Sequence, residues 1–184
     1  MEIRLQCYIS KSKSTASLVP MASPGEMRNI MSKQNVDYYH KIQSFQRKHD
    51  VLAVLIIFDC RGVEDSGPGY RHPCREPNTY DHFPVVLSYP SVFIQKPSIH
   101  LENIQKRIKE RHAELLAMDK IVYNKNVKDL YVYVMYNTDP KMTLVTVFES
   151  GKLRDKETHV TSFMTDLCMQ MRCNKVYESL KLSK

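Results

Sequence analysis

Four side chains able to bind a metal gather in and beside one loop of the sequence. They are Cys60, His72, Cys74 and His82, in the pattern Cys-x11-His-x-Cys-x7-His. Structural zinc sites are commonly built from ligand pairs separated by two to four residues. His72 and Cys74 have a single residue between them, which is awkward for a tetrahedral chelate. The spacing therefore favours a loop with incidental histidines and cysteines, and we expect neither a metal nor a cofactor.

Other patterns for catalysis are incomplete. Cys74 has seven histidines available as a base, but nothing marks an orienting third group or an oxyanion hole. Glu64 and Asp65 are neighbours whose side chains diverge on an extended loop. The glycine-rich run 67–70 does not open a helix or end in Gly-Lys-Ser/Thr, as a phosphate-binding loop would. We expect a non-catalytic protein, with a small metal-dependent or thiol enzyme centred on residues 60–82 as the alternative.

Basic residues exceed acidic ones, with 27 Lys and Arg against 20 Asp and Glu and a formal charge of +7. A basic surface suits nucleic acid, an acidic membrane or an acidic partner. The densest cluster has glutamates beside it, so a solvated helix face is the usual interpretation and no nucleic-acid partner is expected. Binding of nucleic acid or an acidic membrane through this cluster stays as a third hypothesis. Its members are Lys106, Arg107, Lys109 and Arg111, with Glu102, Glu110 and Glu114 nearby.

Tyrosines supply the other candidate contact surface, since the chain has 11 Tyr and no Trp. Tyr131, Tyr133 and Tyr136 lie in a run without charge, and tyrosine is enriched at protein interfaces. An uncharged edge strand readily pairs with another chain. We predict that the hairpin 130–148, with the last helix, forms the main contact, in a homodimer or with another subunit. The alternative is that this strand is central and buried.

The elements that would position these residues follow from the hydrophobic pattern. Two strands, a long helix, a hairpin and a closing helix follow an initial helix capped by Asp37. This order, α-β-β-α-β-β-α, indicates an α+β fold of the roadblock, longin or profilin-like kind, with helices packed on an antiparallel sheet. The expected segments are helix 37–50, strand 51–58 with both faces covered, strand 83–89, a helix from Ser98 with a second helical stretch 118–123, strands 130–136 and 142–148, and a helix 155–171.

Residues 1–34 differ from the rest of the chain. Residues 10–17 are only Ser, Lys, Thr and Ala, and no periodicity is sustained, so a mobile tail is expected before a single α/β domain at 36–184. No apolar run approaches the roughly 20 residues that span a bilayer, and no signal peptide is evident. Five cysteines at irregular spacing indicate reduced thiols. These features predict a cytoplasmic protein.

Several segments, in the same order along the chain, resemble the KICSTOR complex subunit family. The resemblance covers about residues 36–182 and is weaker between Phe93 and Leu116. The segments are Phe45-Gln-Arg-Lys-His-Asp50, Leu55-Ile-Ile-Phe-Asp-Cys-Arg-Gly62, Gly69-Tyr-Arg-His-Pro73, Phe148-Glu-Ser150 with Arg154-Asp155, Ser162-Phe163, and Lys175-Val-Tyr-Glu-Ser-Leu-Lys181.

The resemblance implies a scaffold subunit in nutrient signalling. KICSTOR sits at the lysosomal surface and recruits the GATOR complex, which restrains mTOR complex 1. The implied partners are other KICSTOR subunits and GATOR, with the membrane reached only indirectly. Family members carry an N-terminal helical bundle ahead of this α/β domain, whereas here a short tail precedes it. Contacts made by that bundle are not transferred to this chain.

Overall fold

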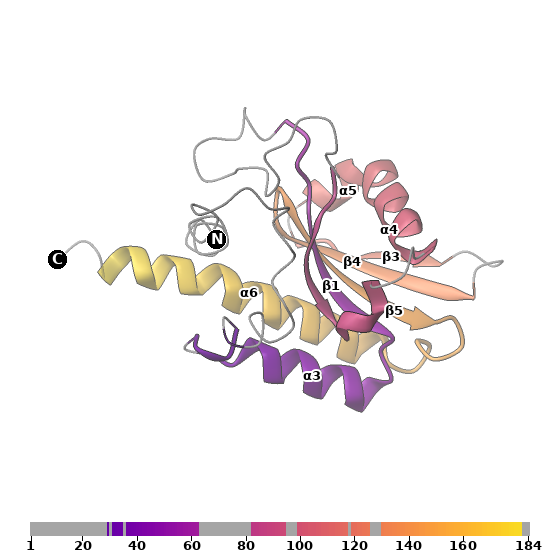
Figure 1. The fold of residues 1–184 in the computed structure, drawn as a ribbon, viewed down its shortest axis with the longest axis horizontal. Helices are drawn as coiled ribbons and strands as arrows, with labels where there is room; N and C mark the ends of the chain where they lie inside the picture. The colour runs from indigo at the N-terminus through magenta and orange to yellow at the C-terminus, as the bar shows by residue number, and fades with distance from the viewer. Residues whose placement is uncertain are drawn as a thin grey trace, which may run out of the picture.

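The computed structural model describes residues 29, 31–34, 36–62, 82–94, 99–117, 119–125 and 130–181, with side chains of the last helix up to Arg172. These residues form an α+β structure around an antiparallel sheet, as predicted, and the sheet has five strands where the sequence pattern predicted four (Figure 1). The elements are α3 (Tyr38–His49), β1 (Ala53–Phe58), β2 (Val85–Tyr89), the 3-10 helix η3 (Ser91–Ile94), α4 (Ile99–Glu110), α5 (His112–Leu116), β3 (Val122–Lys125), β4 (Tyr131–Asp139), β5 (Met142–Glu149) and α6 (Glu157–Lys181).

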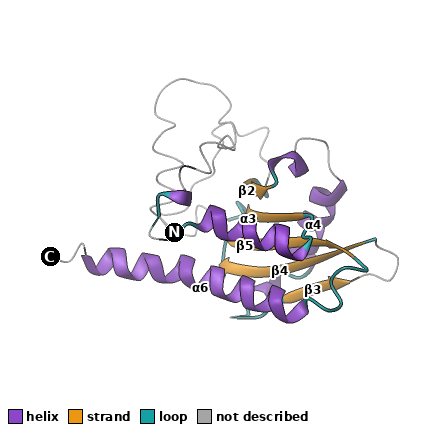
Figure 2. Ribbon diagram, turned by 90° about the horizontal axis from the view of Figure 1, so that it is seen from below, coloured by secondary structure: helices purple, strands orange, loops and turns teal. Residues whose placement is uncertain are grey.

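The strands lie in the order β2-β1-β5-β4-β3, and every neighbouring pair is antiparallel. All six residues of β1 are buried. Successive side chains of a strand point to opposite faces, so a strand buried throughout needs cover on both faces. Helices α3 and α6 lie side by side on one face, and α4 and α5 lie on the other (Figures 1 and 2). This confirms the expectation that both faces of residues 51–58 are covered.

The face under α3 and α6 holds the larger core. Phe45 of α3 stacks on Phe163 of α6, with ring centroids 3.6 Å apart. The apolar stripe predicted for the last helix is confirmed, because its residues pack onto alternate residues of β1, β4 and β5. The buried members are Val160, Phe163, Met164, Leu167 and Cys168 of α6, Tyr38, Ile42 and Phe45 of α3, and Val54, Ile56, Phe58, Leu87, Val132, Val134, Tyr136, Met142, Leu144 and Phe148 of the sheet.

The opposite face is covered by α4 and α5. Ile104 and Ile108 of α4 and Leu115 of α5 are buried against the other set of alternate sheet residues, which includes Leu55 and Ile57. These helix positions are the ones that the sequence pattern predicts to be apolar and inward. The two cores share only the sheet backbone, so β1 and β5 stabilise both layers.

Helix α3 begins and ends as its sequence predicts. The side chain of Asp37 accepts a hydrogen bond from the backbone N–H of His40 at 2.9 Å, which makes it the N-cap. Asp50 closes the helix in the left-handed conformation, with φ of 51°. The Gln46 side chain then donates to the backbone oxygen of Val51 at 2.8 Å. This tight turn leads α3 directly into β1.

Two elements are added to the predicted order, the short helix α5 after α4 and the strand β3 before β4. Residues 118–123 were expected to be helical, but Val122–Lys125 form β3, which pairs with β4 from Val122 opposite Met135 to Lys125 opposite Val132. Pairing with β4 and burial of Val122 outweigh the local helical pattern, as tertiary contacts often do for short segments. The described order is therefore α-β-β-α-α-β-β-β-α, with η3 after β2.

The expected edge strand is central. β4 lies between β5 and β3, and the edges of the described sheet are β2 and β3. Tyr133 is 2% exposed and Tyr136 is 1% exposed, so neither side chain is available on the surface. The premise that this strand is an exposed edge is therefore wrong, and the alternative of a buried central strand holds. A partner contact through the rest of the hairpin and the last helix stays a prediction.

Two predicted segments lie mostly outside the described residues. Of the tail at 1–34, residues 29 and 31–34 are described, and Met31 is buried at 4% exposure against the α3 side of the core. Of the loop at 60–82, residues 63–81 are outside the described part. Among the helices that the structure describes, none has the length and apolar character to cross a membrane.

Replacing Tyr133 with lysine should unfold the protein. The substitution places an ammonium group inside the α4 side of the core, at a cost of more than about 3 kcal/mol. Urea unfolding followed by circular dichroism measures the loss. Leu130→Lys is the matched control, since Leu130 lies just before β4, is 76% exposed and should tolerate the charge. Wild-type stability of Tyr133→Lys would show that β4 is accessible.

Candidate functional site

The structure brings together two of the four candidate metal ligands, through a hydrogen bond between their backbones. The N–H of Cys60 donates to the carbonyl of His82 at 2.9 Å. The Cys60 side chain is buried among apolar residues of the α3 side, whereas His82 is exposed. His72 and Cys74 lie outside the described residues. Within the described ranges, no three His, Cys, Asp or Glu residues are grouped to hold a metal.

A charge pair lies beside Cys60. Asp59 is buried, and Arg61 donates to both of its carboxylate oxygens at 2.9 and 2.7 Å. Burial acts to raise the pKa of Asp59, but the hydrogen bonds and the charge of Arg61 outweigh it and hold the pKa below the ordinary value. The backbone of Asp59 also donates to Lys141 at 2.8 Å. The backbones of Asp59 and Arg61 thus tie the end of β1 to Lys141 before β5, since the Lys141 ammonium also donates to the Arg61 carbonyl, and the ion pair closes the turn between them.

The predicted basic cluster lies on α4 and at the start of α5. Lys106 and Arg107 both approach Glu110, at 3.9 and 3.4 Å. Arg111 makes a two-pronged contact with Glu114, at 2.9 and 2.8 Å. Glutamates three or four residues away on the same helical face therefore offset three of the four cations. A docking role for this cluster stays a prediction.

The fourth cation of the cluster has a different neighbour. Lys109 lies over the ring of Phe83, with Nζ 5.2 Å from the ring centroid, and Arg61 lies 4.8 Å from the same centroid. Such cation–π contacts are modestly stabilising. They join the end of β1, the segment before β2 and α4. Lys109 therefore contributes to the packing of α4 as well as to its charged face.

The predicted tyrosine surface is largely internal. The Tyr133 hydroxyl and Nδ1 of His100 share a hydrogen bond of 3.1 Å. The His100 ring stacks on Phe93 at 5.1 Å and meets the edge of Tyr131 at 4.5 Å. Burial lowers the pKa of His100. Tyr131 is half-buried at the border of this aromatic cluster, so it alone of the three tyrosines retains accessible surface.

Sequence reasoning missed a polar clamp that includes Tyr136. The Tyr136 hydroxyl donates to Oδ1 of Asp119 at 2.7 Å, and Arg172 of α6 donates to the same oxygen at 3.0 Å. Burial and the hydrogen bond to Asp119 raise the pKa of Tyr136 to about 12. Asp119 has a φ of 61°, a conformation that aspartate tolerates better than most residues. No local pattern predicts this clamp, since its members are far apart in the sequence.

Arg172 extends the clamp to the backbone of β4. Its guanidinium donates to the carbonyls of Thr138 and Asn137 at 2.7 and 2.6 Å. One side chain therefore holds α6 against the end of β4. The neighbouring Cys168 is fully buried, and burial raises the pKa of its thiol to about 11. A thiol so far from ionisation is a poor nucleophile near neutral pH.

A second junction joins the C-terminal end of α3 to the N-terminal end of α6. The rings of His49 and His159 are 5.2 Å apart, and Lys156 donates to the His49 carbonyl at 3.0 Å and to Asp50 at 3.2 Å. Burial is the main cause that lowers the pKa of His49, followed by the charges of His159, Lys48 and Lys156. Protonation of His49 therefore opposes the packing of α3 against α6.

The chain is similar to proteins of one family. The family model described as "KICSTOR complex C12orf66 like" matches residues 11–184. KICSTOR subunit 2 of Xenopus laevis is 35% identical over 160 residues, which cover 85% of this chain and 35% of the relative. KICSTOR subunit 2 of Danio rerio is 32% identical over 169 residues, which cover 90% of this chain and 37% of the relative. The chain thus spans about a third of the length of these curated relatives.

Removal of the Arg172 clamp should weaken the attachment of α6. Arg172→Met keeps the length of the side chain but loses its bonds to Asp119 and to two carbonyls, and we expect a loss of about 1–3 kcal/mol in the free energy of unfolding. Urea titration measures this loss. Arg154→Met, at an exposed arginine before α6, is the control. Equal stability of the two variants would contradict a clamp.

The stability of the folded chain should fall as the pH drops below about 6.5, because the pKa of His49 is lowered on folding. The unfolded chain then binds more protons at this site, so the contribution is complete above the unfolded pKa and is lost below it. His49→Gln should reduce this decline. The measurement is urea unfolding of both proteins between about pH 5 and 8. Identical pH dependence in the two proteins would remove His49 as a cause.

Proposed function

The chain belongs to the KICSTOR C12orf66-like family, and on this basis we propose that it is a non-catalytic scaffold subunit in nutrient signalling. The observation that carries the proposal is the match to KICSTOR subunit 2 of two vertebrates over most of this chain. The proposed role is to help recruit the GATOR complex to lysosomes and so restrain mTOR complex 1. Its partners are then the other KICSTOR subunits and GATOR.

The use of polar groups in the described part supports a scaffold over an enzyme. Arg61 pairs with Asp59 within the turn that follows β1, and the Asp119 clamp attaches α6 to β4. Perturbed groups in a cleft would be candidates for catalysis. Here the partners of these groups are neighbouring elements of the fold, so their shifted pKa values follow from structural contacts.

The fold supports the same proposal by analogy. An antiparallel sheet with helices on its faces is the arrangement expected for roadblock, longin and profilin-like domains, which usually serve as docking platforms. We propose that residues 36–184 form one such domain behind a tail at 1–34. We further propose a cytoplasmic location, peripheral at the lysosomal surface and reached through the complex.

Co-purification tests the proposed function. The tagged chain is co-expressed with the other KICSTOR subunits, and GATOR is added to the purified material. We expect the subunits to elute with the tagged chain as one species in size-exclusion chromatography, and GATOR to join it. Tyr133→Lys is the control for a disrupted fold, which should recover neither. A wild-type chain that is folded by circular dichroism but elutes alone would overturn the proposal.

A further inference from the structure

The outer face of α3 carries cations without the acids that accompany those of α4. The helix buries Tyr38, Ile42 and Phe45, and its 12 residues include no aspartate or glutamate. Positions on the opposite side follow helical spacing and are all exposed, which makes one continuous polar stripe. Its members are His40, Ser44, Arg47 and Lys48.

Arg47 and Lys48 form no ion pair with any residue that the structure describes. The adjacent carboxylate of Asp50 is engaged by Lys156 of the neighbouring segment at 3.2 Å. On the other side of the sheet, Lys106 and Lys120 lie near Glu110 and Glu114, at 3.9 and 3.3 Å. Each helix has three Lys and Arg, but the charge of α3 is therefore less compensated than that of α4.

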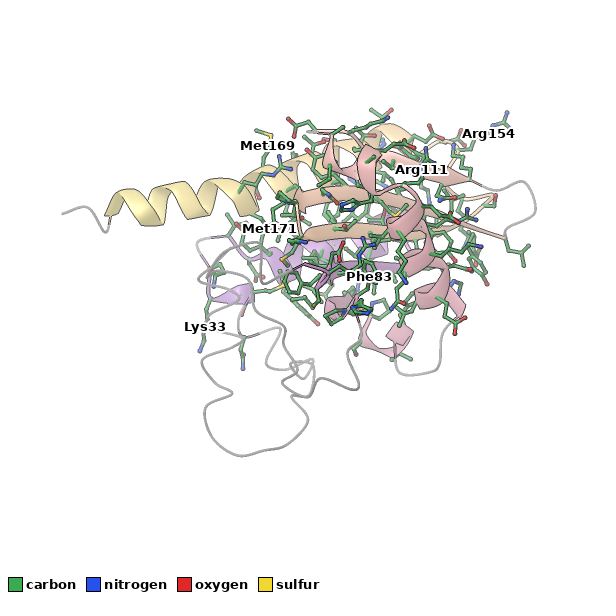
Figure 3. All side chains as sticks on the ribbon, turned by 90° about the horizontal axis from the view of Figure 1, so that it is seen from above. Lys33, Phe83, Arg111, Arg154, Met169 and Met171 are labelled. Atoms are coloured by element: carbon green, nitrogen blue, oxygen red, sulfur yellow. The ribbon has the colours of Figure 1, made fainter. Side chains whose placement is uncertain are left out.

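The same surface continues onto the segment that leads into α6. Lys156 ties this segment to the end of α3, and Leu153 is buried in the core beneath it. Arg154 is exposed without an ion pair in the described part of the chain, and it projects away from the body of the protein (Figure 3). His159 lies beside His49 at the junction. The segment that carries Arg154 is thus tied to the end of α3 through Lys156.

We propose that this surface, made of Arg47, Lys48 and Arg154 with His40 and His159 at its borders, binds an acidic segment of another subunit. This inference rests on the proposed function, because it identifies the side of the chain that the complex would contact. Arginine suits such a role, since its planar group binds carboxylates through two parallel hydrogen bonds. Paired charges across an interface also set orientation and rate of association.

The distribution of charge favours a protein partner over a lipid surface or nucleic acid. Segments that bind anionic membranes commonly present four to eight clustered Lys and Arg. Here three uncompensated cations are interspersed with the exposed acids Asp50 and Asp155. A uniformly anionic surface would repel those acids. An acidic protein segment can place its carboxylates beside the cations and away from Asp50 and Asp155.

Arg47 and Lys48 also have a role within α3. They lie in its last turn, where cations interact favourably with the helix dipole. That role alone predicts a change in the stability of the chain and none in its association. The experiment therefore measures both properties on each variant.

The test replaces Arg47 and Lys48 with glutamate in the chain co-expressed with the other KICSTOR subunits. We expect apparent affinity for the subunits to fall about tenfold or more, and the wild-type affinity to weaken as salt is raised. Lys106→Glu with Lys120→Glu is the matched control, because it makes the same change in charge on the other face of the sheet. Arg47→Gln with Lys48→Gln is a milder variant that serves if the glutamates impair folding.

A zero-length carbodiimide crosslinker identifies the contact directly, since it joins a lysine amine to a carboxylate. Crosslinks from Lys48 to Asp or Glu of a partner subunit, together with selective loss of affinity in the α3 variants, support the inference. Unchanged affinity in both α3 variants, or equal loss in the control pair, overturns it. Wild-type binding to phosphatidylserine vesicles that depends on Arg47 and Lys48, with complex assembly unaffected, also overturns it. If the wild-type chain fails to assemble at all, the proposed function is what fails.

Discussion

The two-sided burial of β1 is the constraint on which the rest of the structure depends. Its six residues are apolar and buried, with Val54, Ile56 and Phe58 on one face and Ala53, Leu55 and Ile57 on the other. A strand without a polar side cannot lie at the surface of a sheet exposed to water. Helices must then cover both faces, and β1 must pair on both edges. It does so with β2 and β5, which completes the backbone hydrogen bonds that burial requires.

This constraint determines where the outer helices go. α3 precedes β1 by a tight turn, so the helix folds back onto the face that holds Val54 and Ile56. α6 comes from the hairpin on the far side of β1 and fills the remaining half of the same face, where Phe45 and Phe163 stack. The helices of these packing layers cover both faces of the sheet. The surface left for any partner is therefore the outer sides of the helices and the borders of the sheet, where complementary charges set specificity and the rate of association.

The sequence correctly predicts the elements that are defined by a local pattern of residues. It does not predict the features that depend on residues far apart in the sequence. The apolar run of β1, the Asp37 cap of α3 and the stripe of α6 each follow from residues within one or a few turns. β3 has only four residues, and its identity as a strand depends on pairing with β4. This error caused a second one, because β4 is expected to lie at the edge of the sheet when β3 is not predicted as a strand. The Tyr136 clamp could not be predicted for a related reason, since Tyr136 and Arg172 are separated from Asp119 by 17 and 53 positions in the sequence.

The basic residues show the same limit of sequence reasoning, because a count of cations along a segment does not tell which of them pair with acids in the fold. Linear density selects residues 106–111, where four cations occur within six positions. On a helix, however, the neighbours of a charge are the residues three and four positions away, and there α4 and α5 supply Glu110 and Glu114. α3 has three Lys and Arg but no acid among its residues, and folding places a further segment with Arg154 beside its end. The electrostatic potential at the protein surface depends on the charges that have no oppositely charged neighbour in the folded structure. In this chain the helix without acids therefore presents more uncompensated charge than the segment with the highest count of lysines and arginines.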